Sequence, residues 1–329
     1  MKSSRENVAS AIEFRKPDRL PMIFDAFGVS DVHRIKWNEI GTGDHTQSLT
    51  FDEWNCGWSR SEVKNMGQVT VHPLDSWRNL ESYRWPDPDD PAFYEGMDAR
   101  FAGSEDKYVL TDIFMVLFER MHSLRGFQNL LTDLLLEQEK VGDLADRIVE
   151  IHERIIENLS QRFPGMIHGI IFTDDWGTEE NLMISPELWI EFFQPRYRRI
   201  FDACKNAGWH VWLHSCGKIN EIIGDLIDVG VDVLNLQQPT VLGIEEIGRE
   251  YSGKVCFLSL CDIQKTLPFK DGEAIVEEAN SLLRHWGTDD GGFILGDYGD
   301  GEAISVPLWK KKIMFDAFVS ADRWSEPSR

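Results

Sequence analysis

The chain has 329 residues, of which 42% are hydrophobic and 27% are charged, a composition typical of a globular protein with a large core. Its 56 acidic residues outnumber 34 basic ones and give a formal net charge of −22, which disfavours nucleic acid and anionic membranes as partners. No apolar run is long enough to span a bilayer, and the first residues lack the apolar stretch of a secretory signal, so we expect a cytoplasmic protein.

The elements predicted before residue 107 are irregular. Ser4 is predicted to cap a first helix that continues to Phe14, and residues 20–25 are predicted to form the first strand. Residues 51–85 are rich in Gly, Trp and Pro and contain short extended pieces such as 68–72. This composition indicates an elaborated subregion rather than a simple strand-helix unit.

From residue 107 onward, strands and helices alternate regularly. Strands are predicted at 108–111, 167–175, 231–235, 255–260 and 292–297 and before His214, and helices at 126–136, 141–163, 186–207 and 272–286. Such alternation implies parallel pairing through right-handed crossovers, and the number of strands approaches eight. We therefore predict a single α/β domain over residues 1–329, a (β/α)8 TIM barrel. Residues 1–106 supply N-terminal elaborations and the first strand, and residues 107–320 supply the regular units.

The run Val211–Gly217 is the most informative motif. An apolar strand ends in His214 and Cys216, which are spaced one residue apart and followed by glycine. Strand alternation directs both side chains to the same side, and imidazole and thiolate are ligands that zinc prefers. We predict that His214 and Cys216 bind zinc, with Cys261 as the third ligand or Asp297 in its place. Without metal, Cys216 beside His214 is a candidate thiolate nucleophile.

Polar residues that follow the strands of a barrel converge on one mouth. Asp174 and Asp175 end one strand. Strand alternation places Asp174 on the same face as Ile170 and Phe172, which we interpret as facing the barrel interior, so Asp174 is predicted to face the pocket. Two neighbouring carboxylates push one pKa upward and favour a general acid or base; the alternative is that they cap the following helix. The predicted catalytic residues are Asp174, Asp175 and Asp262, and the predicted substrate-binding residues are Asp25, Asn235, Gln237, Gln264 and Tyr298.

Several short motifs, distributed over nearly the whole chain, together resemble the uroporphyrinogen decarboxylase superfamily, in particular its branch of corrinoid-dependent methyltransferases. The motifs lie at residues 4–8, 16–21, 72–74, 83–88, 118–120, 124–127, 174–178, 184–187, 214–217, 230–235 and 262–268. The resemblance implies a (β/α)8 barrel whose His-x-Cys motif, here His214 and Cys216, supplies two zinc ligands. It also implies methyl transfer between a thiol bound to that zinc and methylcobalamin carried by a partner protein.

Two departures from the family pattern shape the functional prediction. The family's late cysteine ligand is absent, since residues 296–300 read Gly-Asp-Tyr-Gly-Asp, and residues 24–28 lack the arginines of the decarboxylases. A tetrapyrrole with many carboxylates needs several arginines, so porphyrinogen decarboxylation is disfavoured. We predict a zinc-assisted methyltransferase or demethylase that acts between a small methylated compound or thiol and a cobalamin carrier. The alternatives are a metal-independent decarboxylase and a non-catalytic ligand-binding or corrinoid-binding relative. A corrinoid-binding protein and a second copy of the chain are candidate partners.

Overall fold

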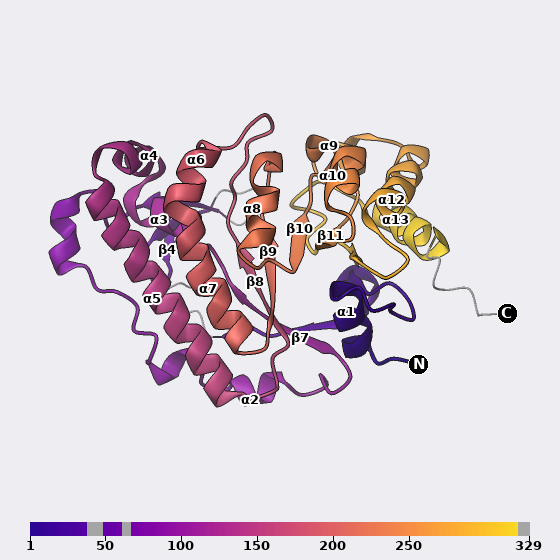
Figure 1. Cartoon of the computed structure of the whole chain (residues 1–329), viewed down its shortest axis with the longest axis horizontal. Helices are drawn as coiled ribbons and strands as arrows, with labels where there is room; N and C mark the ends of the chain where they lie inside the picture. The colour runs from indigo at the N-terminus through magenta and orange to yellow at the C-terminus, as the bar shows by residue number, and fades with distance from the viewer. Residues whose placement is uncertain (38–48, 61–66, 322–329) are drawn as a thin grey trace.

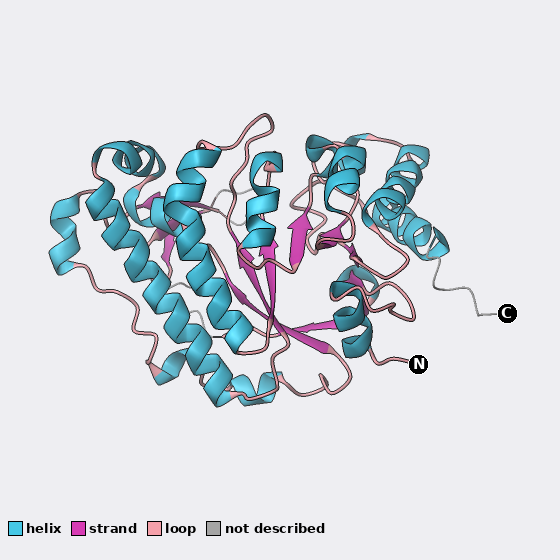
Figure 2. Ribbon diagram, viewed as in Figure 1, coloured by secondary structure: helices cyan, strands magenta, loops and turns pink. Residues whose placement is uncertain are grey.

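The computed structural model describes residues 1–37, 49–60 and 67–321. Within these residues, nine strands form one sheet in the order β2-β1-β12-β11-β10-β9-β8-β7-β3, and every neighbouring pair is parallel except β1 with β2. The sheet curls into a nearly closed barrel with the helices outside it (Figures 1 and 2), which confirms the predicted (β/α)8 fold. The strands are β1 (Met22–Phe24), β2 (Val29–Ser30), β3 (Val32–Arg34), β7 (Tyr108–Ile113), β8 (Gly169–Thr173), β9 (His210–His214), β10 (Val233–Leu236), β11 (Cys256–Ser259) and β12 (Phe293–Gly296).

Asp31 joins the two sides of the seam in the barrel. Its backbone N–H donates to the Met22 carbonyl of β1 at 2.8 Å, and its carbonyl accepts from the Tyr108 N–H of β7 at 3.0 Å. Its buried carboxylate also pairs with Arg19 at 2.6 Å and accepts a hydrogen bond from the Ser4 hydroxyl at 2.6 Å. Asp31 therefore connects β1 to β7 across the seam between β2 and β3, the two ends of the described sheet.

Helices follow the strands and cover the outside of the sheet. The principal ones are α3 (Phe118–Arg125), α4 (Phe127–Leu136), α5 (Gln138–Arg162), α6 (Pro186–Leu188), α7 (Gln194–Asn206), α8 (Ile223–Asp228), α9 (Pro239–Leu242), α10 (Ile244–Tyr251), α11 (Thr266–Phe269), α12 (Gly272–Trp286) and α13 (Leu308–Ala321). Ser185 caps α6, since its hydroxyl accepts the Leu188 N–H at 3.2 Å. In the described part of the chain, no helix combines the length and apolarity needed to cross a membrane.

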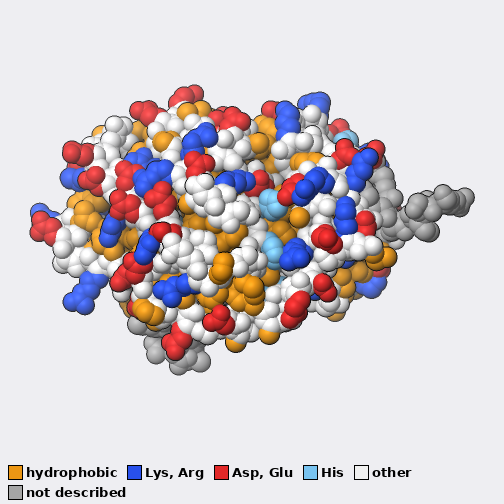
Figure 3. Space-filling model, turned by 60° about the horizontal axis from the view of Figure 1, so that its bottom comes forward, with side chains coloured by type: hydrophobic (Ala, Val, Ile, Leu, Met, Phe, Trp, Pro, Cys, Tyr) orange, Lys and Arg blue, Asp and Glu red, His pale blue; other side chains and the backbone are white. Residues whose placement is uncertain are grey.

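Helix α1 (Ser4–Ile12) fills the amino-terminal end of the barrel. Val8 and Ile12 pack among the inward-facing side chains Tyr108, Leu110, Trp212, Val233, Cys256, Leu258 and Ile294. The helix begins one residue earlier than predicted, because Ser3 rather than Ser4 is its cap and forms a capping box with Glu6. Figure 3 shows this lower face of the molecule, where acidic and basic side chains are interspersed rather than gathered into one charged patch.

The N-terminal elaboration adds a second, smaller sheet. Strands β4 (Leu49–Phe51), β5 (Gly57–Ser59) and β6 (Gln68–Val71) are antiparallel and pack beside α3. The fully buried Arg120 of α3 pairs with Asp52 at 2.9 Å and lies over the Trp54 ring, 5.0 Å from its centroid. This ion pair attaches the small sheet to the first helix after β7.

Candidate metal centre

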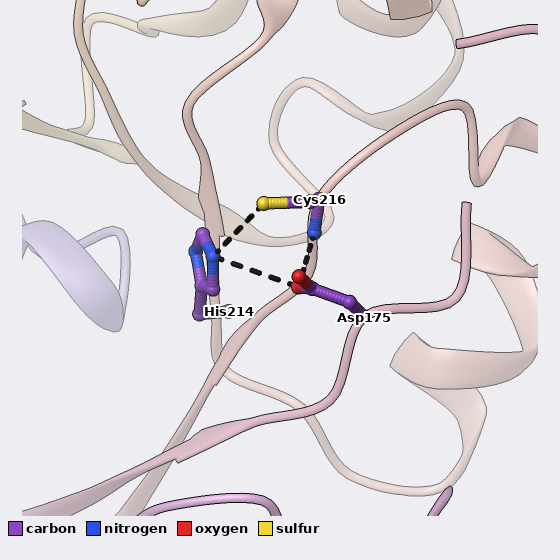
Figure 4. Close-up of side chains that lie close together, drawn as sticks. All are labelled: Asp175, His214 and Cys216. Atoms are coloured by element: carbon purple, nitrogen blue, oxygen red, sulfur yellow. Dashed lines mark hydrogen bonds and ion pairs between the residues drawn. The ribbon is translucent and has the colours of Figure 1, made fainter. Parts of the chain in front are cut away.

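Three side chains meet at the carboxyl ends of β8 and β9. His214 is the last residue of β9, Cys216 lies two residues further on, and Asp175 lies two residues past β8 (Figure 4). His214 Nε2 is 3.4 Å from Cys216 Sγ and 3.7 Å from Asp175 Oδ1. One possible ligand atom from each residue lies within 4.8 Å of the other two, so the three atoms can surround a single ion. Each side chain is partly exposed, which leaves the group accessible from the mouth.

Glycines allow the two loops that carry these residues to touch. The Cys216 N–H donates to Asp175 Oδ1 at 2.8 Å, and the Gly177 N–H donates to the Cys216 carbonyl at 3.2 Å. Gly217 has a φ of 80°, and a Cβ there would overlap the carbonyl of Gly177. A side chain at Gly217 would therefore force the Asp175 and Cys216 loops apart.

Asn235 fixes the orientation of the His214 ring. His214 Nδ1 donates to Asn235 Oδ1 at 2.9 Å and also lies 3.1 Å from the Asn235 carbonyl oxygen. Because both partners are acceptors, Nδ1 carries the proton and Nε2 keeps its lone pair toward Cys216. The Asn235 amide in turn donates to the Leu258 carbonyl at 3.1 Å and accepts from Gln237 Nε2 at 3.5 Å. Metal-bound histidines in proteins are commonly held in this way.

The electrostatics of the site favour a cation. Burial, together with the nearby Asp175 and Glu119, raises the pKa of the Cys216 thiol. Burial likewise raises the pKa of Glu119, and the charges of Asp175 and Asp174 raise it further. Among the described residues, no ion pair joins Asp174, Asp175 or Glu119 to a lysine or arginine. Cys216 binds a metal as a thiolate, and a bound cation would offset its repulsion from the Asp175 carboxylate.

The prediction that Asp174 faces the pocket is wrong. Its fully buried carboxylate accepts the backbone N–H groups of Leu117, Phe118 and Glu119 at 2.6–3.1 Å and the hydroxyl of Tyr197. It therefore caps α3 from the wall of the barrel, and Asp175 is the residue that faces inward. Ile170 and Phe172, which lie at alternate positions with Asp174 along the strand, pack outward against the helices. The residues between them, such as Ile171, face the barrel interior, so the strand has the opposite orientation to the one predicted.

The predicted third zinc ligands also lie elsewhere. Cys261 is fully buried in the wall, where its thiol donates to the Ile275 carbonyl of α12 at 3.4 Å. Asp297 forms an ion pair with the buried Lys311 of α13 at 3.1 Å. Asp262, predicted as catalytic, is buried as a turn residue, and its Oδ1 accepts the N–H groups of Gln264 and Lys265 at 2.8 Å. Each side chain already has a partner, and among the described residues none of the three belongs to the group formed by Asp175, His214 and Cys216.

The predicted substrate-binding residues divide into two groups. Asn235 and Gln237 lie directly behind His214, and Tyr298 lies close enough to Cys216 for the thiolate charge to raise its pKa, after the larger effect of burial. Asp25 and Gln264 are exposed beyond the strand ends. A substrate-binding role for these residues stays a prediction.

Three further residues near the site were not predicted from the sequence. Gln238 is buried and accepts the Gly217 N–H at 2.6 Å. Glu119 is buried with one carboxyl oxygen lacking a hydrogen-bond partner. His122 is near enough to feel the charge of Asp175, and burial, aided by the charges of His72 and Arg120, lowers its pKa to about 4. Gln238 lies two residues after the end of β10, a position that could have identified it; Glu119 and His122 lie on a helix that was not predicted.

The fold and the site together define a parallel β/α barrel protein with a candidate metal centre at its mouth. The family model described as uroporphyrinogen decarboxylase (URO-D) matches residues 114–319. This match covers more than half of the chain, and the protein therefore belongs to the uroporphyrinogen decarboxylase family. A search of curated proteins gave no match.

A solved structure has the same fold. A methyltransferase from Methanosarcina mazei has a TM-score of 0.70 at 14% identity, with 97% of this chain and 99% of that chain covered. Lower similarity is found to an intracellular xylanase from Thermoanaerobacterium saccharolyticum (TM-score 0.39, 10% identity, 65% and 73% covered). Xylanase 10B from Thermotoga petrophila has a TM-score of 0.37 at 11% identity, with 68% and 70% covered. The first of these similarities extends over the complete barrel and its N-terminal elaboration.

Proposed function

We propose that this protein is a methyltransferase or demethylase of the uroporphyrinogen decarboxylase family that holds a zinc ion between His214, Cys216 and Asp175. The observation that carries the proposal is the convergence of these three side chains, whose ligand atoms lie within 4.8 Å of one another. One nitrogen, one sulfur and one oxygen donor match the protein ligands of catalytic zinc sites, which keep a fourth position open. Asp175 takes the place that Cys261 or Asp297 had in the prediction from sequence.

The residues around the site would have two roles, binding the metal ion and orienting its ligands. His214, Cys216 and Asp175 hold the ion, and Asn235 keeps the His214 lone pair directed toward it. When bound, zinc lowers the pKa of an incoming thiol or hydroxyl group and makes it nucleophilic at neutral pH. The barrel wall beneath, with Trp212 and Leu258 among its inward side chains, excludes water from below.

The reaction proposed is transfer of a methyl group between a thiol, or a small methylated compound, and cobalamin on a partner protein. In the thiol direction, the sulfur–carbon bond forms as the cobalt–carbon bond breaks. The electron pair of the broken bond stays on cobalt, and the proton of the thiol leaves to solvent. The methyltransferase from Methanosarcina mazei supports this class of reaction by its similarity of fold.

Charge at the mouth favours methyl transfer over porphyrinogen decarboxylation. A substrate with many carboxylates requires cationic partners. Here Asp175 is partly exposed beside His214 and Cys216, and the buried Lys311 is already paired with Asp297. A small thiol or methylated compound has no such requirement.

Protein purified without chelators or a metal-binding tag tests the proposal. About one zinc per chain by elemental analysis is expected, as is loss of methylcobalamin absorbance with at least one member of a panel of thiols, with free methylcobalamin as the probe. The variant Cys216→Ser should lose both. Metal-free protein that decarboxylates porphyrinogens would instead support the decarboxylase alternative. Metal-free protein that binds methylcobalamin without turnover would support the non-catalytic alternative.

A further inference from the structure

The backbone around Cys216 is held by three partners from two other loops. Its N–H donates to Asp175 after β8, the next N–H, of Gly217, donates to Gln238 after β10, and Lys218 N–H donates to the Thr178 carbonyl at 2.8 Å. Gln238 supplies a side-chain contact from the β10 side. Its amide oxygen lies 2.6 Å from the Gly217 nitrogen, and the side chain is only 4% exposed.

We propose that Gln238 is a positioning residue that sets the direction of the Cys216 thiol and thereby the affinity of the site for metal. The inference rests on the metal centre of the proposed function. Gly217 has a left-handed φ of 80°, so the turn after Cys216 is not stabilised by a helix or a strand. The Gln238 bond satisfies the Gly217 N–H at this turn, in a place where water has little access.

The second end of the Gln238 amide fixes which atom faces Gly217. Its Nε2 donates to Glu179 Oε1 at 3.3 Å, and Glu179 Oε2 pairs with Lys265 Nζ at 3.1 Å. Because a carboxylate only accepts, the amide nitrogen must face Glu179 and the amide oxygen must face Gly217. The Cys216 loop is thereby connected through one buried side chain to the loops that follow β8 and β11.

Removal of this amide has a defined consequence for the metal site. In Gln238→Leu, the Gly217 N–H loses its acceptor and the turn gains alternative conformations, so Cys216 spends less time directed at His214 and Asp175. Loss of a residue that orients a metal ligand typically weakens metal binding about 10–100-fold. Gln194→Leu is the matched control, since Gln194 is also partly buried and its amide donates to Asp225 at 3.4 Å, on the outside of the barrel.

Cobalt titration of the full-length, metal-free protein measures the effect. Co²⁺ is the probe, its thiolate-to-cobalt absorption reports the Cys216 bond, and competition with a chelator gives the dissociation constant. Gln238→Leu should raise this constant about 10–100-fold and weaken the charge-transfer band. Gln194→Leu should change neither. The double variant Gln238→Glu/Glu179→Gln keeps both hydrogen bonds: the Gly217 N–H still donates to residue 238, and donor and acceptor are exchanged only between residues 238 and 179. It should bind Co²⁺ more tightly than Gln238→Leu.

Thiol reactivity gives a second readout that needs no metal. Cys216 is the one partly exposed thiol among the five cysteines, all of which are described, so a disulfide reagent reports mainly on it. Gln238→Leu should react faster than the unsubstituted protein, and the double variant should react more slowly than Gln238→Leu. Equal reactivity and equal cobalt affinity in all variants would overturn the positioning role. Failure of the unsubstituted protein to bind Co²⁺, with the reactivity differences intact, would overturn the metal centre but not the role of Gln238 in holding Cys216.

Discussion

Asp174 and Asp175 are adjacent in the chain, yet their carboxylates lie on opposite sides of the barrel wall. Asp174 points outward and caps α3, where burial raises its pKa to about 7 against the opposing effect of its hydrogen bonds. Asp175 points inward and accepts the Cys216 N–H beside His214. The Asp174 carboxylate therefore stabilises the start of a helix on the outside of the barrel, and the Asp175 carboxylate lies at the barrel mouth.

Substitution should separate these two roles. We expect Asp174→Ala to lower the free energy of unfolding by about 2–4 kcal/mol, because buried backbone N–H groups lose their acceptor. Its folded fraction should still bind zinc. Asp175→Asn keeps an oxygen that can accept the Cys216 N–H, so it should retain stability to within about 1 kcal/mol and lose metal affinity. Urea denaturation and elemental analysis measure both quantities, and a stable Asp174→Ala protein would refute the capping role.

Glu119 should make the metal-free protein less stable as the pH rises. Its folded pKa lies above the ordinary glutamate value of about 4.3, so the folded state binds more protons than the unfolded state above that pH. The free energy of unfolding then falls with rising pH, by at most about 1.4 kcal/mol per pH unit for one group.

The comparison must be made with Glu119→Gln, because buried histidines act in the opposite direction. Burial lowers the pKa of His122 and His168 to about 4 and that of His152 to about 3, and this increases stability as the pH rises from about 4 toward 6.5. Relative to the unsubstituted protein, Glu119→Gln should therefore gain stability as the pH increases from 5 to 8. A difference in unfolding free energy that stays constant over this range would contradict the raised pKa.

Cys261 provides a direct test of the ligand set. Its thiol is buried against α12, so Cys261→Ala should lower the free energy of unfolding by about 1 kcal/mol through lost packing. Zinc content should remain at about one ion per chain. The matched variant Cys216→Ala should show the reverse pattern, with little change in stability and no zinc. Loss of zinc from Cys261→Ala in a folded protein would restore the ligand set predicted from sequence.

Lys311 and Asp297 form a buried ion pair in which the two side chains are only 3% and 2% exposed. Removal of one partner leaves an uncompensated buried charge, so Lys311→Met should destabilise the fold by about 3–5 kcal/mol. The double variant Lys311→Met/Asp297→Asn removes both charges and should recover a large part of that loss. A double-mutant cycle of unfolding free energies measures the coupling, and additive effects would show that the pair does not interact.

The barrel and the His-x-Cys pair could be predicted from the sequence because both depend on local patterns. Alternating apolar strands and helices identify the fold, and the position of His214 at the end of β9 follows from the apolar run before it. The orientation of the neighbouring strand could not be predicted in the same way. Both faces of a barrel strand are buried, so the apolar character of Ile170 and Phe172 does not distinguish the wall from the interior.

The rest of the site depends on contacts between distant loops, which no local pattern reports. Gln237 was selected from sequence and Gln238 was not, although both follow the same strand. The structure assigns the buried contact with Gly217 to Gln238. Cys261 was selected because it follows a strand, yet the side chain turns to the Ile275 carbonyl rather than to the mouth. Such differences of direction arise from how each chain segment bends after its strand.

Pairing between the first and last strands has a consequence for how the molecule assembles. Met22 of β1 is aligned with Leu295 of β12, two residues separated by most of the chain. Contacts of such long sequence separation carry a high loop-closure entropy and slow the folding of a domain. During synthesis, α1 emerges before the strands of the barrel and has no finished barrel to fill until β12 has left the ribosome. A chain cut before β12 is therefore an open sheet with unpaired edges rather than a smaller barrel, and it would be prone to aggregate.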